Sequence, residues 1–332
     1  MRVLAGDIGG TNTRLILADC TDNVCIPVVE RVYPSAAHAD LVPIVLGFLE
    51  STGEAGSALE RACFAVAGPV QEDPAGQVAR ITNLPWELHS ARLAAVLGIP
   101  RVRLINDFQG VGYGIDALSS ADFEELQTGR EIPHAPRVVI GAGTGLGQAI
   151  LIWQTDHYEV YPTEGGHVDF APTDERQIAL LREMMREFGR VSYERVVSGP
   201  GLIRIYSFLR DQGETTESPE LREAMHQGDP AAAISAFALT RNDPLASMAL
   251  DLFIQVYGAQ AGNLALTCLA RGGVYIAGGI APRIIERLRS GAFLQAFNDK
   301  GRMAPLTAEM PVRVILNPKV GLLGAALAAT RL

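Results

Sequence analysis

The chain has 332 residues, of which 48% are hydrophobic and 20% charged, and its formal net charge is −9. This composition predicts a folded protein of two domains, or one large domain, and argues against a disordered chain. Lysine occurs only twice, so clustered basic side chains that would attract nucleic acid or an anionic membrane are not expected.

The remaining composition points to a cytoplasmic protein. The cysteines, Cys20, Cys25, Cys63 and Cys268, have neither CxxC nor Cys/His zinc spacing, and we expect reduced thiols. The N-terminus enters a strand without the pattern of a signal peptide. The apolar stretch 245–270 contains Asp251 and several amides, so it predicts a buried helix and not a membrane span.

In chain order, the first half predicts strands at 3–5 and 14–18 that form a hairpin around a glycine-rich turn. A helix at 41–49, a strand at 61–66, a helix at 88–97 and a strand at 102–105 follow. Gly98 and Pro100 end the helix at 88–97, and the strand at 102–105 runs into Asn106 and Asp107.

The same pattern restarts in the second half. Strands are expected at 137–140 and 148–153, helices at 174–188 and 201–210, a polar surface segment at 211–230 and the buried helix at 245–270. Strands at 273–277 and 312–316 and a helix at 321–330 end the chain. The stretches VLAGDIGGTNTRLIL (3–17) and VVIGAGTGLGQAILI (138–152) share a strand, turn, strand plan, which predicts two related α/β halves.

Neither glycine-rich turn matches a familiar phosphate motif. A Walker loop requires a lysine, and the first lysine is Lys300; a dinucleotide fingerprint requires a helix where 148–153 predicts a strand. A glycine hairpin can still bind phosphate through converging N–H groups, and Thr11 and Thr144 add hydroxyl donors. The alternative is a plain hairpin, which needs only one or two glycines.

Asp7 lies in the first of these turns. A carboxylate beside a phosphate repels it unless a cation lies between them, so the pattern predicts Mg²⁺ held by Asp7 directly or through water. The alternative is an aspartate that caps its own turn.

The motifs taken together resemble one family. GDIGGTNTRL (6–15) and GAGTGLG (141–147) resemble the two phosphate loops of the superfamily of sugar kinases, actin and heat-shock chaperone ATPases. LINDF (104–108), EGGHVDFAP (164–172), ERVVSGPGL (194–202) and VYIAGGIAPR (274–283) are similar, in order, to blocks of the bacterial glucokinases, in the branch without structural zinc. The resemblance runs from residue 3 to the last helix.

The resemblance implies an α/β fold of two ribonuclease-H-like (actin-like ATPase) domains flanking a cleft that closes on the sugar. A small domain is expected at 1–115 with about 306–332, so that the last strand and helix return to it. A large domain at 116–305 would carry the second phosphate loop and the adenosine site. Closure would exclude water from the reaction.

The implied activity is ATP-dependent phosphorylation of the 6-hydroxyl of D-glucose, with Mg²⁺, by a cytoplasmic homodimer. The implied nucleotide-binding residues are Gly6, Asp7, Ile8, Gly9, Gly10, Thr11, Asn12, Gly143, Thr144 and Gly145, with Gly278 and Gly279 by the adenosine. A simple strand-to-helix turn is the alternative for the last glycine pair.

A sugar site needs polar groups that pair with hydroxyls, because a wrong sugar leaves some of them unpaired. The resemblance assigns this role to Asn106, Asp107, Glu164, His167 and Glu194, with Asp107 as the general base. The alternatives are a turn dipeptide at 106–107, a structural histidine, and a surface glutamate paired with Arg190 or Arg195. Zinc at His167 is not expected, because no cysteine cluster follows it.

Three other functions compete with a glucose kinase. A sugar-responsive transcription regulator needs a helix-turn-helix before the first loop, which begins at residue 6. A non-catalytic scaffold or chaperone ATPase has no use for Asp107 and the sugar-binding set. A kinase of another hexose stays an alternative, since the fold alone does not choose the sugar.

Overall fold

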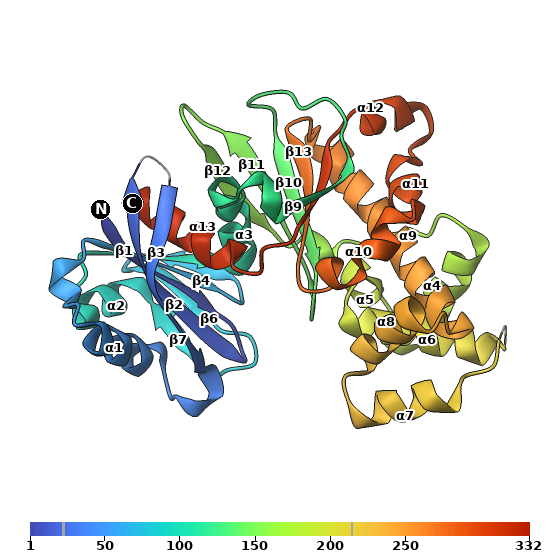
Figure 1. Ribbon diagram of the computed structural model, residues 1–332, viewed down its shortest axis with the longest axis horizontal. Coiled ribbons are helices and arrows are strands. Elements are labelled where there is room, and N and C mark those ends of the chain that lie inside the picture. The colour runs from blue at the N-terminus through green and yellow to red at the C-terminus, as the bar shows by residue number, and fades with distance from the viewer. Residues whose placement is uncertain (22–23, 214) are drawn as a thin grey trace. The chain divides into compact units, whose positions relative to one another are not determined.

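The computed structural model describes residues 1–21, 24–213 and 215–332 (Figure 1). The chain forms two compact units. Unit 1 consists of Met1–Asp122, Asp156–Pro162 and Asn317–Leu332, and unit 2 of Phe123–Thr155 and Thr163–Leu316. In the described part of the chain, no helix has both the length and the apolar character needed to cross a membrane.

Unit 1 is built on a five-stranded sheet with the order β3-β2-β1-β4-β8. Its strands are β1 (Arg2–Ile8), β2 (Asn12–Thr21), β3 (Val24–Pro34), β4 (Arg61–Val66) and β8 (Arg101–Asn106). β1 pairs antiparallel with β2 and parallel with β4, and β4 pairs parallel with β8. The interior strand β4 is apolar after Arg61 and almost fully buried, as expected where both faces of a sheet are covered.

Helices and a small sheet complete unit 1. α1 (Leu41–Thr52) and α2 (Ser90–Leu97) bury Phe48 and Leu93 in the core of this unit. α3 (Asp107–Gly114) follows β8, and β5 (Val70–Asp73), β6 (Gly76–Arg80) and β7 (Glu87–His89) form a three-stranded sheet. α1 begins at its N-cap Asp40 and ends at Gly53, whose φ of 68° suits glycine.

Unit 2 repeats this plan. The second sheet has the order β12-β11-β10-β13-β14-β9, and residues 158–162 of its edge strand β12 are counted with unit 1. The strands are β9 (Phe123–Gln127), β10 (Arg137–Ala142), β11 (Leu146–Trp153), β12 (Tyr158–Thr163), β13 (Gly273–Ala277) and β14 (Val312–Ile315). β10 and β11 form an antiparallel hairpin, and β10, β13 and β14 run parallel, as β1, β4 and β8 do in unit 1. The two related halves predicted from the sequence repeat are therefore confirmed.

The helices of unit 2 include one long buried helix. They are α4 (Glu175–Phe188), α5 (Tyr193–Val196), α6 (Gly199–Gln212), α7 (Pro219–Gln227), α8 (Pro230–Thr240), α9 (Pro244–Cys268), α10 (Ile285–Arg289), α11 (Ala292–Asn298) and α12 (Ala304–Ala308). Short 3₁₀ turns include η5 (Gly165–His167) and η6 (Ala281–Ile284). α9 is the buried helix expected from its composition, and α6, α8 and α11 pack most closely against it.

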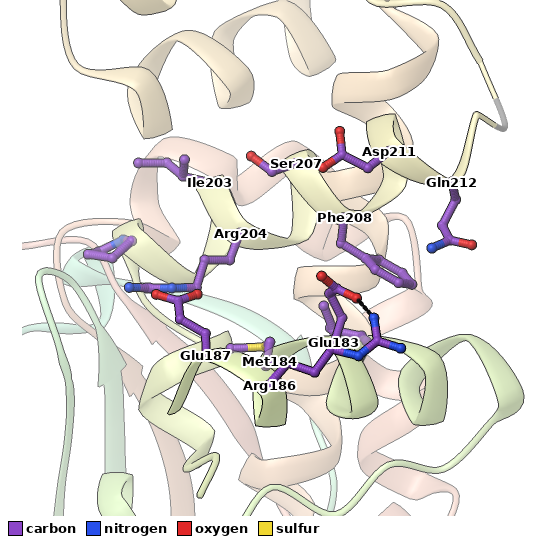
Figure 2. Close-up of a pocket in the computed structure, with 12 residues that line it drawn as sticks. Glu183, Met184, Arg186, Glu187, Ile203, Arg204, Ser207, Phe208, Asp211 and Gln212 are labelled. Carbon is purple, nitrogen blue, oxygen red and sulfur yellow. Dashed lines mark hydrogen bonds and ion pairs between the residues drawn. The ribbon is translucent and has the colours of Figure 1, made fainter. Parts of the chain in front are cut away.

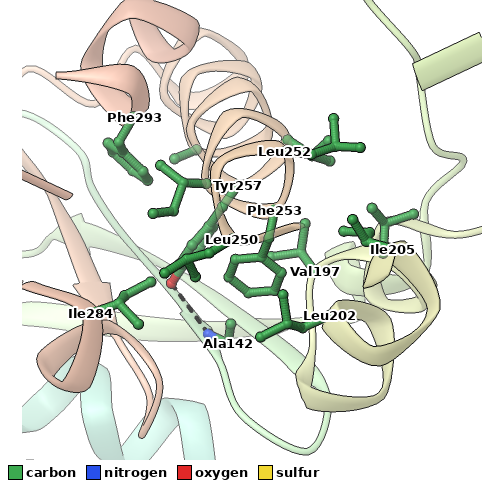
Figure 3. Close-up of a cluster of buried hydrophobic side chains, with 14 of the residues drawn as sticks. Ala142, Val197, Leu202, Ile205, Leu250, Leu252, Phe253, Tyr257, Ile284 and Phe293 are labelled. Atoms are coloured by element: carbon green, nitrogen blue, oxygen red, sulfur yellow. Dashed lines mark hydrogen bonds between the residues drawn. The ribbon is translucent and has the colours of Figure 1, made fainter. Parts of the chain in front are cut away.

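The core of unit 2 supports the second glycine turn directly (Figure 3). The buried Tyr257 of α9 accepts a hydrogen bond from the Ala142 amide and donates one to the Ile140 carbonyl, both at 3.2 Å. Burial raises the pKa of Tyr257, so the phenol stays a neutral donor and acceptor. The last residues of β10 are thus fixed just before Gly143.

The final strand contradicts the expectation that it returns to the first half. β14 pairs with β13 and β9 in the second sheet, and 306–316 belong to unit 2. Only α13 (Val320–Thr330) returns, and it packs on β1, β4 and α3 (Figure 1). The first boundary also lies at Asp122 and not near residue 115. A short apolar strand shows its burial in the sequence but not its pairing partner, which is non-local.

The expectation of four reduced thiols is wrong for one pair. Cys20 and Cys25 lie opposite each other in the β2–β3 pairing and form a disulfide. Cys63 and Cys268 are free, and burial raises the pKa of the Cys63 thiol to about 12. Antiparallel pairing, which the spacing of the cysteines alone does not reveal, brings the first two together.

Candidate active site

The first glycine turn and the Asn106–Asp107 pair lie at one edge of the unit 1 sheet. In the parallel register, Ile8 pairs with Val66, and Val66 pairs with Asn106. Strands β1, β4 and β8 therefore end side by side. The carboxyl edge of parallel strands is where α/β proteins bind ligands, because the following loops converge there.

Hydrogen bonds from Ser35, and one within the turn, fix the backbone of the first glycine turn. Ser35 donates from its hydroxyl to the Gly9 carbonyl at 2.8 Å and from its amide to the Thr11 carbonyl at 2.9 Å. The Gly9 amide donates to the Asn12 carbonyl at 3.0 Å. Thr11 and Asn12 are exposed. The turn is therefore rigid on one side and open on the other, as a phosphate loop requires.

Asp7 is placed on β1 directly opposite Arg14 on β2. Burial raises the pKa of Asp7, and the Arg14 charge partly lowers it. Among the described residues, no three or more His, Cys, Asp or Glu side chains gather as a metal cage. A single carboxylate fits Mg²⁺, because this ion keeps several waters and shares its remaining positions with substrate phosphates.

Asn106 and Asp107 form the start of a helix that the sequence did not predict. Asn106 is the N-cap of α3: its Oδ1 accepts from the Phe108 amide at 2.9 Å, and its Nδ2 donates to the Gly68 carbonyl at 3.1 Å. Asp107 is the first helical residue and is half-buried. A helix N-terminus favours an ionised carboxylate. Asn106, a typical N-cap residue, was the sequence signal for α3. The three glycines of α3 oppose a helix prediction and obscured that signal.

The structure brings the three predicted sugar-binding residues of unit 2 together. His167 ends η5, and its Nδ1 lies 3.8 Å from Oε1 of Glu194 while its Nε2 lies 3.8 Å from Oε2 of Glu164. The His167 side chain is 58% exposed, so it is not a buried structural histidine. Two carboxylates around one imidazole present acceptors and donors to a polar ligand.

Glu194 is not the arginine-paired surface glutamate of the alternative interpretation. Arg190 pairs with Asp169, and the Arg195 guanidinium lies 3.9 Å from the centre of the Phe188 ring. Oε2 of Glu194 instead accepts from the Leu146 amide at 2.9 Å. The bond ties the predicted sugar-binding set to the end of the second glycine turn.

The glycine pair at 278–279 packs on that second turn. Gly278 has a φ of +82°, and a Cβ atom there would lie 2.4 Å from the Ala142 carbonyl oxygen, so the close approach requires glycine. The Ile280 amide donates to the same carbonyl at 3.3 Å, and the Gly199 amide donates to the Gly143 carbonyl at 2.8 Å. Three segments far apart in sequence thus meet at Ala142 and Gly143.

A cavity of about 660 Å³ opens beside these segments. Its walls include Gly143, Thr144 and Gly279, the start of α6, and one side of α8 with Ala231, Ala232, Ser235 and Ala236. The volume is in the range of small-molecule sites, and the alanines leave room for a flat group. α8 is a helix that was not predicted from the sequence, although Asp229 and Pro230 form a typical helix start.

A second cavity, of about 870 Å³, lies between α4 and α6 (Figure 2). Met184, Ile203 and Phe208 contribute apolar walls, and Arg186 at its rim pairs with Glu183 at 2.5 Å. It contains none of the residues predicted for the site.

Comparisons with known proteins agree on one family. The family model described as Glucokinase matches residues 4–332. The glucokinase of Nostoc punctiforme is 48% identical over 344 aligned residues, which cover 99% of each chain. The solved structure of a glucokinase from an Antarctic psychrotroph has a TM-score of 0.86 at 30% identity, over 100% of this chain and 99% of that one.

A more distant structure shows the same fold. A ROK family glucokinase from Streptomyces griseus, solved in complex with glucose and AMPPNP, has a TM-score of 0.65 at 20% identity and covers the full length of both chains. The actin-like ATPase fold expected from the sequence is therefore confirmed.

Proposed function

The chain belongs to the glucokinase family, and we infer from this premise that it transfers the γ-phosphoryl group of ATP to the 6-hydroxyl of D-glucose. The observation that carries the inference is the cluster of Glu164, His167 and Glu194 beside a glycine turn. Polyhydroxyl binding groups and a phosphate loop in one unit are what a sugar kinase needs.

We assign the general base to Asp107. Phosphoryl transfer requires the attacking hydroxyl to be oriented in line and to lose its proton late, and a carboxylate can do both. Asn106 precedes it at the same sheet edge and would orient the sugar. Glu164, His167 and Glu194 would hold other hydroxyls. A sugar lacking one of these hydroxyls would leave a polar group unpaired, which is the source of selectivity.

We propose that ATP spans both glycine turns. The adenosine would occupy the cavity between α6 and α8, where Gly279 contributes a wall, with Gly278 supporting it behind. The phosphates would meet the backbone amides of the turns at 6–12 and 143–145. Backbone amides suit this chain, because it has no lysine before Lys300.

Mg²⁺ would be held by Asp7 together with the ATP phosphates. When bound, the ion neutralises phosphate charge and polarises the transferred group. The site fits this ion, because burial raises the pKa of Asp7 by removing water from its carboxylate. A bound cation would stabilise the ionised form of that carboxylate. We further propose a homodimer in the cytoplasm, for which light scattering would give about twice the mass of one chain.

The test is a coupled assay of glucose 6-phosphate formation with ATP and Mg²⁺. Wild type should be active, and Asp107→Asn should lose about 10²–10⁴-fold in kcat while still binding glucose, because it keeps the shape and loses the proton acceptor. The exposed Asp299→Asn is the matched control.

Two results would contradict the proposal. Unchanged kcat in folded Asp107→Asn would refute the role of Asp107. A wild type that is inactive on glucose but active on another hexose would favour the alternative kinase.

A further inference from the structure

We propose that Gln109 is a positioning residue that fixes Asp107 in place by joining the start of α3 to strand β12. The inference rests on the proposed role of Asp107 as base. Gln109 is not one of the residues proposed to touch substrate, and it acts only through the backbone of its neighbours.

The side chain of Gln109 makes two bonds in opposite directions. Its Oε1 accepts from the amide of Asn106 at 3.2 Å, and its Nε2 donates to the carbonyl of Val160 in β12 at 2.9 Å. Asn106 is the residue before Asp107. One half-buried amide therefore connects the backbone next to the proposed base with a strand more than fifty positions along the chain.

Helix α3 depends on such contacts for its position. It has only eight residues, DFQGVGYG, and three of them are glycine. Glycine is a much poorer helix former than alanine, and helices this short are not stable alone. Gly112 lets α3 approach β12 closely, because a Cβ atom there would lie 2.6 Å from Cγ1 of Val160. Packing against Val160, together with the more extensive packing against α13, thus replaces the helix propensity that the sequence lacks.

The far end of α3 is fastened to the same strand. Tyr113 donates from its hydroxyl to Oε1 of Glu159 at 2.6 Å, and Arg103 lies 3.6 Å from that oxygen. β12 thus holds α3 at Tyr113 and at Gln109, and the Gln109 bond is the one nearest Asp107. β12 also leads directly into Glu164, so the same strand precedes the sugar-binding loop.

The chemistry of the amide separates this role from ordinary helix capping. A capping box accepts either Glu or Gln at this position, since only an acceptor for the N-cap amide is needed. The Val160 carbonyl needs a donor, which Gln supplies and ionised Glu does not. A capping role therefore predicts a fully active Gln109→Glu variant, and a positioning role predicts an impaired one.

The experiment compares kcat and KM of Gln109→Glu and Gln109→Ala with wild type in the glucose 6-phosphate assay. We expect kcat to fall about 10- to 100-fold in both, in the range that small misplacements of reacting groups cost. The KM for ATP should stay within about twofold, because the nucleotide cavity belongs to unit 2.

The matched control is Gln127→Glu. Gln127 also donates from Nε2 to backbone carbonyls, those of Thr307 and Met310, at 2.9 and 2.7 Å. It lies in β9, outside the proposed site, so this variant should lose thermal stability and keep kcat. If kcat falls in proportion to the loss of thermal stability in the Gln109 variants and in Gln127→Glu alike, the inference is overturned.

Two further results would decide against it. If Gln109→Glu keeps the wild-type kcat, Gln109 serves only as the capping-box residue of α3 and does not position Asp107. If Gln109→Glu does not fold, Gln109→Met, which fills similar space without either bond, takes its place, and wild-type kcat there would have the same meaning. Wild type and Asp107→Asn, measured alongside, report separately on the proposed function.

Discussion

At the scale of single residues, Asp7 differs in its environment from Glu164 and His167. Burial raises the pKa of Asp7, whereas the carboxylate of Glu164 and the imidazole of His167 are exposed. Exposed groups keep their hydration until a ligand replaces it. A buried carboxylate has already lost hydration and gains most from a cation.

The raised pKa makes Asp7 a cost to stability at neutral pH. The pKa of Asp7 is 3.8 in the unfolded chain and higher in the folded protein, so the folded protein holds this proton more tightly. The free energy of unfolding therefore falls as the pH rises from 3.8 through the folded-state pKa. Asp7→Asn should therefore be at least as stable as wild type at pH 7. Its kinase activity should fall on the order of 100-fold or more, because a carboxylate for Mg²⁺ is gone.

Thermal melts and the coupled assay, each across Mg²⁺ concentrations, check this prediction. Asp299→Asn serves again as a control, since it removes one exposed carboxylate. A variant that is less stable than wild type and still fully active would show that Asp7 is a structural turn residue.

At the scale of elements, the start of α6 joins the two ligand sets of unit 2. Ser198 is its N-cap: its hydroxyl accepts from the Gly201 amide at 3.1 Å and donates to the Glu194 carbonyl at 2.7 Å. The next residue, Gly199, bonds the carbonyl of Gly143. One helix start therefore contacts both the segment of Glu194, which we propose binds the sugar, and the turn that we propose binds phosphate.

Ser198→Ala should affect stability and binding together. Loss of the cap should lower the free energy of unfolding by about 0.5–2 kcal/mol, and the freed Glu194 segment should raise the KM for glucose several-fold. Asp174→Ala removes the N-cap of α4, which accepts from the Gln177 amide at 2.8 Å, and is the matched control. Denaturant unfolding and steady-state kinetics measure both effects. Equal KM values in the two variants would argue against coupling through α6.

At the scale of the whole molecule, the proposed function assigns one glucose to residues of both units. Glucose should then slow hydrogen exchange at 104–110 in unit 1 and at 163–168 in unit 2 at the same concentration. The physical reason is that a bound ligand suppresses local opening wherever it makes contacts. Exchange measured by mass spectrometry, with and without glucose, tests this expectation.

The control region for that experiment is β9, which should keep its exchange rate. Glu194→Gln should weaken protection in both segments together. Protection confined to one segment would contradict a shared sugar and would require separate binding to a single unit.

The sequence by itself determined the features that are local. The strand–turn–strand units and the buried α9 follow from glycine turns and apolar periodicity, and the motif residues around Asp107, Glu164 and Gly278 follow from the resemblance of their blocks to those of the glucokinases. Such signals depend on neighbouring residues, so one sequence is enough to find them.

Only the tertiary structure decided the features that depend on distant partners. It assigned β14 to the second sheet, joined Cys20 to Cys25, and formed α3 despite its three glycines. It also showed His167 between Glu164 and Glu194. Strand pairing and close packing link residues far apart in the chain, and their energies outweigh the local propensities that a sequence displays.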